Sequence, residues 1–232
     1  MKIALLGYGK MGQVVEKIAL QRGHEIVFKK TSSNSFEGLE NADVAIEFSV
    51  PNAAVENISN SLRAGIPTVS GTTGWLSDYH CVESLCVQND TAFLYASNFS
   101  LGVNLFFELN DYLAKMMSRF DSYKVSIEEI HHTQKLDAPS GTAISLANSI
   151  ISNSDLDNWT INDKKPNELY INAKRIEGVP GTHIVAYQSD VDRIEIQHVA
   201  HSRDGFGLGA VIAAEWLVGK KGVFTMKDVL EI

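Results

Sequence analysis

The chain has 232 residues, enough for one large domain or two small ones, and 44% are hydrophobic and 21% charged, as in ordinary globular proteins. The formal net charge of −8 argues against a nucleic-acid partner, because nucleic-acid binding needs a basic surface. The N-terminal apolar run is too short for a signal peptide, and no run approaches the roughly 18 residues of a membrane span. Cys81 and Cys86 form no CxxC or metal pattern. We therefore expect a cytoplasmic protein with no membrane partner.

The first hundred residues alternate between short apolar runs and segments of helical periodicity. Residues 2–7 (KIALLG) have the composition of a buried parallel strand, and the connection 31–42 is too short and polar for a full crossover helix. The predicted strands are 2–7, 25–30, 43–48, 66–70 and 91–96, and the predicted helices are 10–22, 51–64 and 76–88. This alternation predicts an α/β fold with a doubly wound parallel sheet.

The pattern changes after Ser97, where alternating strands replace the strand–helix alternation. Residues 153–167 are polar and predict loops, while residues 207–218 are rich in small residues and predict a helix that returns to the first domain. The remaining predicted elements are the helices 103–118 and 143–151 and the strands 123–131, 168–176, 182–189 and 192–200. We expect a mostly antiparallel second sheet, a dinucleotide-binding domain of residues 1–98 plus 205–232, and a smaller α+β substrate domain of residues 99–204.

A glycine-rich turn lies between the first strand and the first helix. Gly7-Tyr8-Gly9-Lys10-Met11-Gly12 matches GxGxxG, in which the glycines form the tight turn, admit a pyrophosphate and let the helix pack closely. The hexapeptide alone is a weak signal, and its position at the first strand–helix turn makes it a strong one. We predict a dinucleotide site here.

The second strand ends without the acidic residue that favours NAD. Phe28-Lys29-Lys30-Thr31 stands where an Asp or Glu would bind the ribose hydroxyls. Lys10, Lys29 and Lys30 either neutralise a 2′-phosphate or are simply solvated, and the sequence leaves both interpretations open. NADPH, NADH or both are therefore the expected cofactors.

Other polar and glycine-rich segments follow the predicted parallel strands at the same sheet edge. Gly71-Thr72-Thr73-Gly74 offers hydroxyls and close-approach glycines for a nicotinamide, and Phe48-Ser49 and Ser97-Asn98-Phe99-Ser100 end neighbouring strands. Taken singly, each segment is more typical of an ordinary turn.

Residues 128–143, EEIHHTQKLDAPSGTA, form the sharpest motif. Adjacent histidines His131 and His132 at a strand end point to opposite faces, so they should have different tasks. Lys135 supplies a cation nearby, and the helix start at Ser140-Gly141-Thr142 predicts a carboxylate site. The histidines alternatively only pack or cap. A metal site is not expected, because HHxxK lacks zinc-ligand spacing and no third ligand is evident.

With these motifs together, the chain resembles the dihydrodipicolinate reductases over essentially its whole length. The agreeing segments are GYGKMG, DVAIEFSVP, SGTTG, ASNFS, EIHHTQKLDAPSGTA and GFGLGAVIAAEWL. The resemblance implies a Rossmann-type domain, a substrate-binding domain that forms a homotetramer, and NAD(P)H-dependent reduction of 4-hydroxy-tetrahydrodipicolinate, a cyclic dicarboxylate, to tetrahydrodipicolinate in lysine and diaminopimelate biosynthesis.

The resemblance also assigns roles to residues. It implies that His131 donates a proton and that Lys135 assists it. From their positions in the sequence, Glu128 and Glu129 are both candidates for tuning the histidine pKa, and the choice between them is open. It assigns the substrate carboxylate contacts to His132, Ser140, Gly141 and Thr142, and the cofactor contacts to Gly7, Gly9, Met11, Gly12, Gly71, Thr73 and Phe99. Six further candidate cofactor contacts come from the strand ends and charges described above, namely Lys10, Lys30, Phe48, Thr72, Ser97 and Asn98. The alternatives are another two-domain dehydrogenase of small acids and a non-catalytic nucleotide-sensing regulator.

Overall fold

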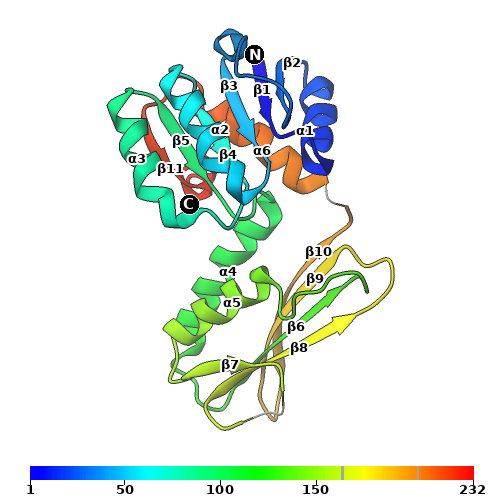
Figure 1. Cartoon of the computed structure of the whole chain (residues 1–232). Coiled ribbons are helices and arrows are strands. Elements are labelled where there is room, and N and C mark those ends of the chain that lie inside the picture. The colour runs from blue at the N-terminus through cyan, green and yellow to red at the C-terminus, as the bar shows by residue number, and fades with distance from the viewer. Residues whose placement is uncertain (163–164, 203) are drawn as a thin grey trace. The chain divides into compact units, whose positions relative to one another are not determined.

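A computed structural model describes residues 1–162, 165–202 and 204–232, and the chain divides into two compact units (Figure 1). Unit 1 contains Met1–Leu101 and Asp204–Ile232, and unit 2 contains Gly102–Arg203. The C-terminal segment thus returns to unit 1 and completes it.

Unit 1 is built on a six-stranded sheet in which every pairing is parallel. The strand order is β11-β5-β4-β3-β1-β2. The strands are β1 (Lys2–Leu6), β2 (Glu25–Lys30), β3 (Val44–Glu47), β4 (Thr68–Ser70), β5 (Ala92–Tyr95) and β11 (Gly222–Phe224). The five predicted strands are present, whereas the sequence analysis did not predict β11.

Helices cover both faces of this sheet. Along β1, Ile3 and Leu5 join the apolar cluster formed with α1 and α6, while Ala4 and Leu6 join a second cluster on the opposite face. The helices are α1 (Lys10–Gln21), α2 (Pro51–Arg63), α3 (Tyr79–Gln88), α6 (Asp204–Leu217) and α7 (Met226–Leu230), with short 3-10 turns at Leu39–Asn41 and Leu76–Asp78. The predicted doubly wound, Rossmann-type sheet is confirmed, including the shortened connection after β2.

Helix α6 packs on unit 1 because small residues let its neighbours approach closely. A Cβ on Gly207 would lie 2.8 Å from Val14 of α1, and one on Gly209 would lie 1.7 Å from the carbonyl oxygen of Phe99. Larger residues at these two positions would force α6 away from α1 and from Phe99 within unit 1.

Unit 2 contains a five-stranded sheet with two helices, α4 (Leu101–Met117) and α5 (Gly141–Ser152). The order is β10-β9-β6-β8-β7, formed by β6 (Lys124–His131), β7 (Asn158–Thr160), β8 (Glu168–Arg175), β9 (Gly181–Gln188) and β10 (Arg193–Ala200). The expected mostly antiparallel sheet is wrong. Only β10–β9 and β6–β9 are antiparallel, whereas β6–β8 and β7–β8 are parallel.

The helix α5 connects β6 to β7 and provides the crossover by which β7 runs in the same direction as β6. The strand β7 lies inside the predicted loop 153–167, which is therefore also wrong in part. Alternation within each strand shows which residues are half-buried, and it does not show the direction of the neighbouring strand.

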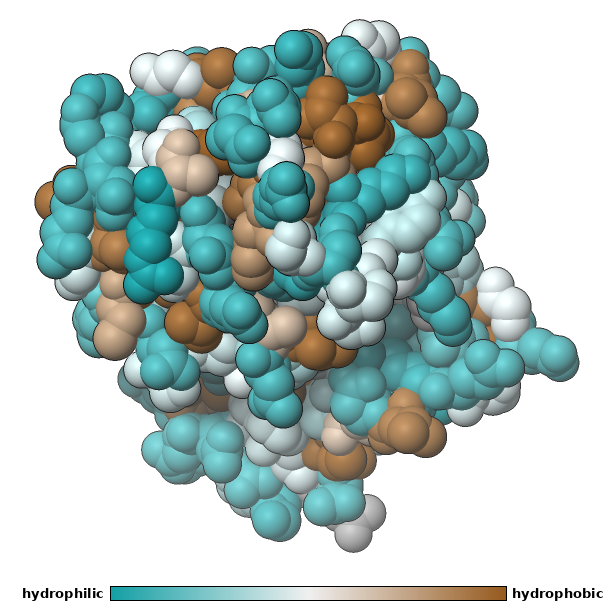
Figure 2. Space-filling model, turned by 45° about the horizontal axis from the view of Figure 1, so that its top comes forward, coloured by the Kyte–Doolittle hydropathy of each residue, from teal (hydrophilic) through white to brown (hydrophobic). Residues whose placement is uncertain are grey.

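One face of this sheet is covered by α4 and α5. Ile127, Ile171 and Val185, from β6, β8 and β9, pack with residues of both helices into the core of unit 2. On the other face of β6, Glu128 and Ile130 remain half-buried. Among the described residues, no helix is long and apolar enough to cross a membrane. On the face drawn in Figure 2, hydrophobic residues are scattered among hydrophilic ones.

Candidate functional sites

The first candidate site is a pocket of about 320 Å³ in unit 1, where β1 and β3 end. The chain winds toward β2 on one side of β1 and toward β3, β4 and β5 on the other, and nucleotides bind at such switch points. Its lining is Gly9, Lys10, Met11, Phe48, Ser49, Pro51, Gly71, Thr72 and Thr73. Seven predicted cofactor residues from three separate segments therefore meet in one pocket, and Ser49 and Pro51 are additional.

Two glycines are required by the geometry of this pocket. Gly7 has φ +104°, and a Cβ there would lie 2.2 Å from the carbonyl oxygen of Phe48. A Cβ on Gly71 would lie 2.1 Å from the Phe48 ring. Gly9 differs from both, because no atom lies within 4 Å of a Cβ placed there. Gly9 borders open space at the start of α1, and the free backbone N–H groups of a helix start are a typical binding site for phosphate.

The buried carboxylate of Glu47 stabilises the wall of the pocket. Glu47 was not among the predicted site residues. Glu47 is fully buried at the end of β3 and accepts hydrogen bonds from Ser49 N at 3.0 Å, Ser70 Oγ at 2.7 Å and Thr72 Oγ1 at 2.8 Å. Thr72 Oγ1 also accepts from Ser49 N. The Thr72 hydroxyl is thus occupied by hydrogen bonds within the pocket wall. Thr73 is more exposed, so its hydroxyl is the one that a ligand can reach.

The lysines after β2 have different surroundings. Lys29 Nζ lies 2.5 Å from Glu16 Oε1 and donates to Tyr8, and the hydrogen bond to Glu16 raises the pKa of Lys29. Lys30 Nζ instead donates to the carbonyl oxygens of Thr31 and Asn34. Lys29 is therefore neutralised internally, whereas no acidic residue in the described part of the chain forms an ion pair with Lys30.

The segment after β5 does not join the described lining of this pocket. Phe99 is buried and contacts Phe48 edge to face, with ring centroids 5.8 Å apart. Its side chain therefore packs against Phe48, which lines the pocket, and does not line the pocket itself. Asn98 Oδ1 accepts from Ser100 N, and Ser97 is exposed. Contacts from Ser97, Asn98 and Phe99 to a cofactor remain predictions.

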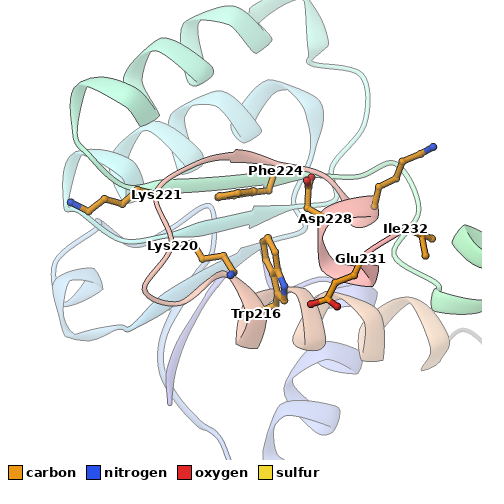
Figure 3. Close-up of a pocket in the computed structure, with 8 residues that line it drawn as sticks. Trp216, Lys220, Lys221, Phe224, Asp228, Glu231 and Ile232 are labelled. Carbon is orange, nitrogen blue, oxygen red and sulfur yellow. The ribbon is translucent and has the colours of Figure 1, made fainter.

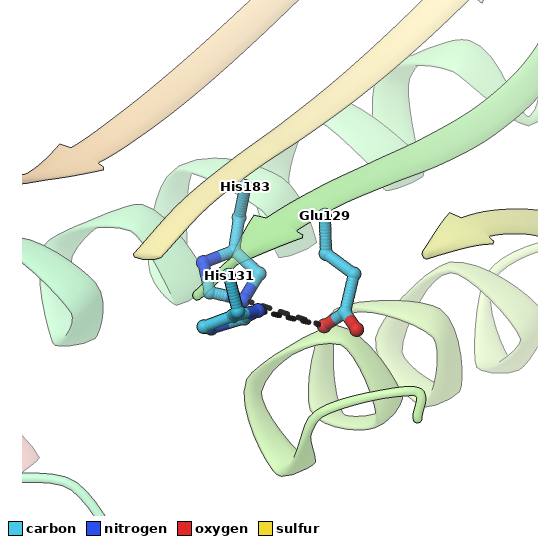
Figure 4. A group of neighbouring side chains, drawn as sticks. All are labelled: Glu129, His131 and His183. Carbon is cyan, nitrogen blue, oxygen red and sulfur yellow. Dashed lines mark ion pairs between the residues drawn. The ribbon is translucent and has the colours of Figure 1, made fainter. Parts of the chain in front are cut away.

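The second candidate site is a charged cluster in unit 2, on the face of the sheet that α5 covers (Figure 4). Glu129 and His131 lie two residues apart on β6, so their side chains share a face. His183 of β9 is paired directly opposite Glu129, and Arg175 of β8 directly opposite His131. Four polar side chains, those of Glu129, His131, Arg175 and His183, thus lie together at one end of the apolar face of the sheet.

The Glu129 carboxylate is the centre of the cluster. It is fully buried, and Oε1 accepts from Arg175 at 3.2 Å while Oε2 accepts from the backbone N of Ser140 at 2.9 Å. His131 Nδ1 lies 3.6 Å and His183 Nε2 3.9 Å from Oε2. Glu128, by contrast, is half-exposed and pairs with Lys174 at 2.6 Å. The structure therefore selects Glu129 as the partner of His131.

The loop between β6 and α5 carries the rest of the motif. Lys135 Nζ is bound by the carboxylate of Asp137 at 2.7 and 2.8 Å, and His132 is half-buried directly after the end of β6. Ser140 caps α5, with its Oγ accepting from Ala143 N at 3.2 Å. Ser140 is buried, so Gly141 and Thr142 present the accessible start of the helix.

Burial controls the protonation of both histidines. It lowers the pKa of His131, and the charge of Glu129 opposes that decrease. Burial also lowers the pKa of His183 to about 4, and the neighbouring His131 acts in the same direction. His183 is thus neutral at physiological pH, and Glu129 is the group that favours a proton on His131.

Glu129, His131 and His183 offer ligand atoms within 4.8 Å of one another, close enough to surround a small cation. Two N–H donors already occupy the carboxylate oxygens, and one of them belongs to the Arg175 guanidinium. A cation would have to displace these donors and tolerate the positive charge of Arg175. The donor set fits a hydrogen-bonded ion network better than a metal centre.

Two further hollows lie apart from the residues of the two candidate sites. One, at the C-terminal end of unit 1, is lined by Trp216 and Phe224, with Lys220 Nζ 4.1 Å from the Trp216 ring centroid (Figure 3). The other, of about 870 Å³, surrounds Lys124 and Tyr187 of unit 2. Lys124 begins β6 and His131 ends it, so this hollow lies at the opposite end of that strand. None of the predicted catalytic, substrate-binding or cofactor-binding residues is among the residues that line these two hollows.

Comparison with known proteins gives a family for the chain. The model of the dihydrodipicolinate reductase N-terminus matches residues 1–99, and that of the C-terminus matches residues 102–230. The chain belongs to the dihydrodipicolinate reductase family. The C-terminal family model includes α6, β11 and α7, which the structure assigns to unit 1. The sequence-based resemblance to dihydrodipicolinate reductases is confirmed.

Individual dihydrodipicolinate reductases agree with this assignment. A 4-hydroxy-tetrahydrodipicolinate reductase of Christiangramia forsetii is 57% identical over 99% of this chain and 98% of its own, and one of Methanocaldococcus jannaschii is 33% identical over 97% and 80%. The dipicolinate-bound dihydrodipicolinate reductase of Paenisporosarcina sp. TG-14 has a TM-score of 0.77 at 22% identity, covering 97% of both chains. The C. glutamicum DAP dehydrogenase has a TM-score of 0.53 at 14% identity, covering 100% of this chain and 93% of its own. These two structures show the fold alone.

Proposed function

We propose that the chain uses NAD(P)H to reduce 4-hydroxy-tetrahydrodipicolinate to tetrahydrodipicolinate, a step of lysine and diaminopimelate biosynthesis. The observation that carries the proposal is the Glu129–His131 pair beside the start of α5, in a chain that also holds a dinucleotide-type pocket. Relatives matched over nearly their whole length are named for this reaction. We assign cofactor binding to unit 1 and substrate binding to unit 2.

The residues of unit 2 supply what reduction of a cyclic dicarboxylate needs. The bound nicotinamide would supply the hydride. Loss of the 4-hydroxyl group as water gives a conjugated imine, which takes up the hydride and one proton. Lys135 and His131 stabilise the negative charge that develops on the conjugated nitrogen and deliver that proton, an effect typically worth about 10²–10⁴-fold. The exposed start of α5 at Gly141 and Thr142, together with His132, holds a substrate carboxylate.

Lys135 must exchange partners in this mechanism. Its ammonium group is bound by the Asp137 carboxylate, which occupies the place of an anion. Asp137 is exposed, so its ion pair with Lys135 is weak and a substrate carboxylate can replace it. Lys135 then gains a partner beside the reacting atoms.

The two alternative functions, another dehydrogenase of small acids and a non-catalytic regulator, are supported less well. Another two-domain dehydrogenase of small acids would share the fold, but it would not need the motif of residues 131–142, which is specific to this family. A non-catalytic regulator would have no use for His131 held by a buried carboxylate.

We further propose a cytoplasmic homotetramer that accepts both NADPH and NADH. Cys81 and Cys86 are both unpaired, which supports a reducing compartment. The face of the unit 2 sheet opposite α4 and α5 carries half-buried and exposed residues such as Ile130, Ile184 and Val199, which supports an assembly surface there. Light scattering on the purified protein should give four times the mass of the chain.

The deciding experiment is an assay of the purified protein with freshly made cyclic dicarboxylate and either nicotinamide cofactor. We expect the protein to consume NAD(P)H only when the cyclic dicarboxylate is present. Aspartate semialdehyde and oxaloacetate are the controls for the alternative dehydrogenases. Turnover of a control compound but not of the cyclic dicarboxylate would overturn the proposal, as would binding of NAD(P)H without turnover of any of them.

A further inference from the structure

The loop that carries Lys135 is attached to the sheet by residues outside its own motif. Arg175 of β8 donates from Nε to the carbonyl oxygen of Lys135 at 3.3 Å and from a terminal nitrogen to that of Asp137 at 2.6 Å. The same guanidinium donates to Glu129 at 3.2 Å. One planar side chain therefore contacts two points of the loop and the carboxylate beside His131.

Glu129 attaches the other end of the same loop. Its Oε2 accepts from the backbone N of Ser140, the residue that caps α5. The pair of Glu129 and Arg175 thus fixes the loop near its middle and at its end. Both side chains lie on the face of the sheet that α5 covers, and Glu129 is fully buried.

We propose that Glu129 and Arg175 form a clamp that positions His131, Lys135 and the start of α5 for the dicarboxylate substrate. The inference rests on the proposed function, and it adds two positioning residues that make no contact with the reacting atoms. A fork of several N–H groups is needed to reach two carbonyl oxygens and a carboxylate at once, so lysine should not replace Arg175. Misplacement of reacting groups by about 1 Å can cost about 10²-fold in rate.

The adjacent residues of the same two strands provide matched controls. Glu128 and Lys174 form an ion pair at 2.6 Å on the opposite face of the sheet, where both are partly exposed. Glu128→Gln and Lys174→Gln remove charges of the same type from the same strands without touching the loop. Neither should change the kinetic constants by more than about twofold, since an exposed ion pair contributes little.

The first test compares steady-state kinetics of the full chain carrying Glu129→Gln, Arg175→Lys or a control substitution. We expect both clamp variants to lower kcat/KM for the dicarboxylate by about 10- to 100-fold. The KM for NADPH should stay within about twofold, because the cofactor pocket lies in unit 1. Titration with dipicolinate should show weakened binding to both clamp variants.

The second test separates positioning from stability with Arg175→Met and the double variant Glu129→Gln/Arg175→Met. Arg175→Met alone leaves Glu129 buried without its cation, so thermal stability should fall; removal of both charges should restore it in part. A clamp requires that kcat/KM for the dicarboxylate remain low in the stabilised double variant. Recovery of activity together with stability would overturn the proposal.

Wild-type kinetic constants in Glu129→Gln or Arg175→Lys would also overturn the clamp. An equal loss of kcat/KM for the dicarboxylate and for NADPH would overturn it as well. These outcomes differ from failure of the proposed function, in which the wild-type protein would not reduce the cyclic dicarboxylate at all.

Discussion

At the scale of single residues, proton delivery depends on two side chains with unlike surroundings. His131 is buried beside Glu129, whereas Lys135 is held by the exposed Asp137. We expect His131→Ala and Lys135→Ala each to lower kcat by about 10²-fold or more, because each removes a group that stabilises charge or donates a proton. Steady-state assays check this, with the exposed neighbour Gln134→Ala as the control. Wild-type kcat in both variants would contradict the assigned roles.

A second expectation at this scale concerns His183 and the pH dependence of stability. Burial lowers the pKa of His183 from 6.5 to about 4, so the folded protein resists protonation while the unfolded chain accepts it below pH 6.5. The unfolded state therefore binds more protons between pH 6.5 and 4, and the stability present above pH 6.5 is lost as the pH falls. For this group the loss is about 2 kcal/mol between about pH 7 and pH 5.

Urea unfolding of the wild type and of His183→Gln at both pH values measures this contribution. The wild type should lose about 2 kcal/mol more between the two pH values than the variant does. Equal losses in the two proteins would show that His183 titrates normally in the folded state.

At the scale of elements, the starts of α1 and α5 perform related tasks in separate units. Both begin beside a glycine, Gly9 in unit 1 and Gly141 in unit 2, and an added Cβ at either would have no atom within 4 Å. An alanine at either position therefore fits the fold, and its methyl group would enter only space that a ligand uses. We expect Gly9→Ala to raise the KM for NADPH and Gly141→Ala to raise the KM for the dicarboxylate, each by about tenfold for a contact of about 1.4 kcal/mol.

Each of these variants is the control for the other. Thermal unfolding should be nearly unchanged in both, unlike Gly71→Ala, whose Cβ would lie 2.1 Å from Phe48. An increase in the KM for the wrong substrate, or an increase for both, would contradict the assignment of one ligand to each unit.

At the scale of the whole molecule, cofactor preference depends on few charges in an acidic protein. Lys29 is neutralised by Glu16, which leaves Lys10 and Lys30 to attract a 2′-phosphate. We expect NADPH to be used at least as well as NADH, with an advantage of about tenfold or less, since an exposed charge pair contributes at most about 1 kcal/mol. Raising the salt concentration should reduce the advantage.

The measurement is kcat/KM for both cofactors at low and high salt, for the wild type and for Lys30→Gln. Lys29→Gln is the matched control, since that charge is already compensated. A clear NADH preference at low salt would contradict the expectation and would indicate an acidic residue near the ribose, such as Glu37 or Glu40.

The sequence by itself determined the elements and the family of this protein. Hydrophobic periodicity is local, so it located five strands of the unit 1 sheet and four of unit 2, and GxGxxG with the motif of residues 131–142 located both candidate sites. Three of the described strands span only three residues each; β4 was predicted from the segment IPTVS that contains it, whereas β7 and β11 were missed.

Only the tertiary structure decided which strands are neighbours and what lies between them. Strand pairing brings Arg175 and His183 beside Glu129 from positions 46 or more residues further along the chain, and no local pattern records this pairing. The same is true of Glu47, an acidic residue in an apolar strand that is bound by Ser70 and Thr72, more than 20 residues further along the chain. Motifs identify residues that meet a ligand directly. The groups that hold those residues in place are distant in the chain, because a sheet joins its strands by hydrogen bonds between segments and not by sequence order.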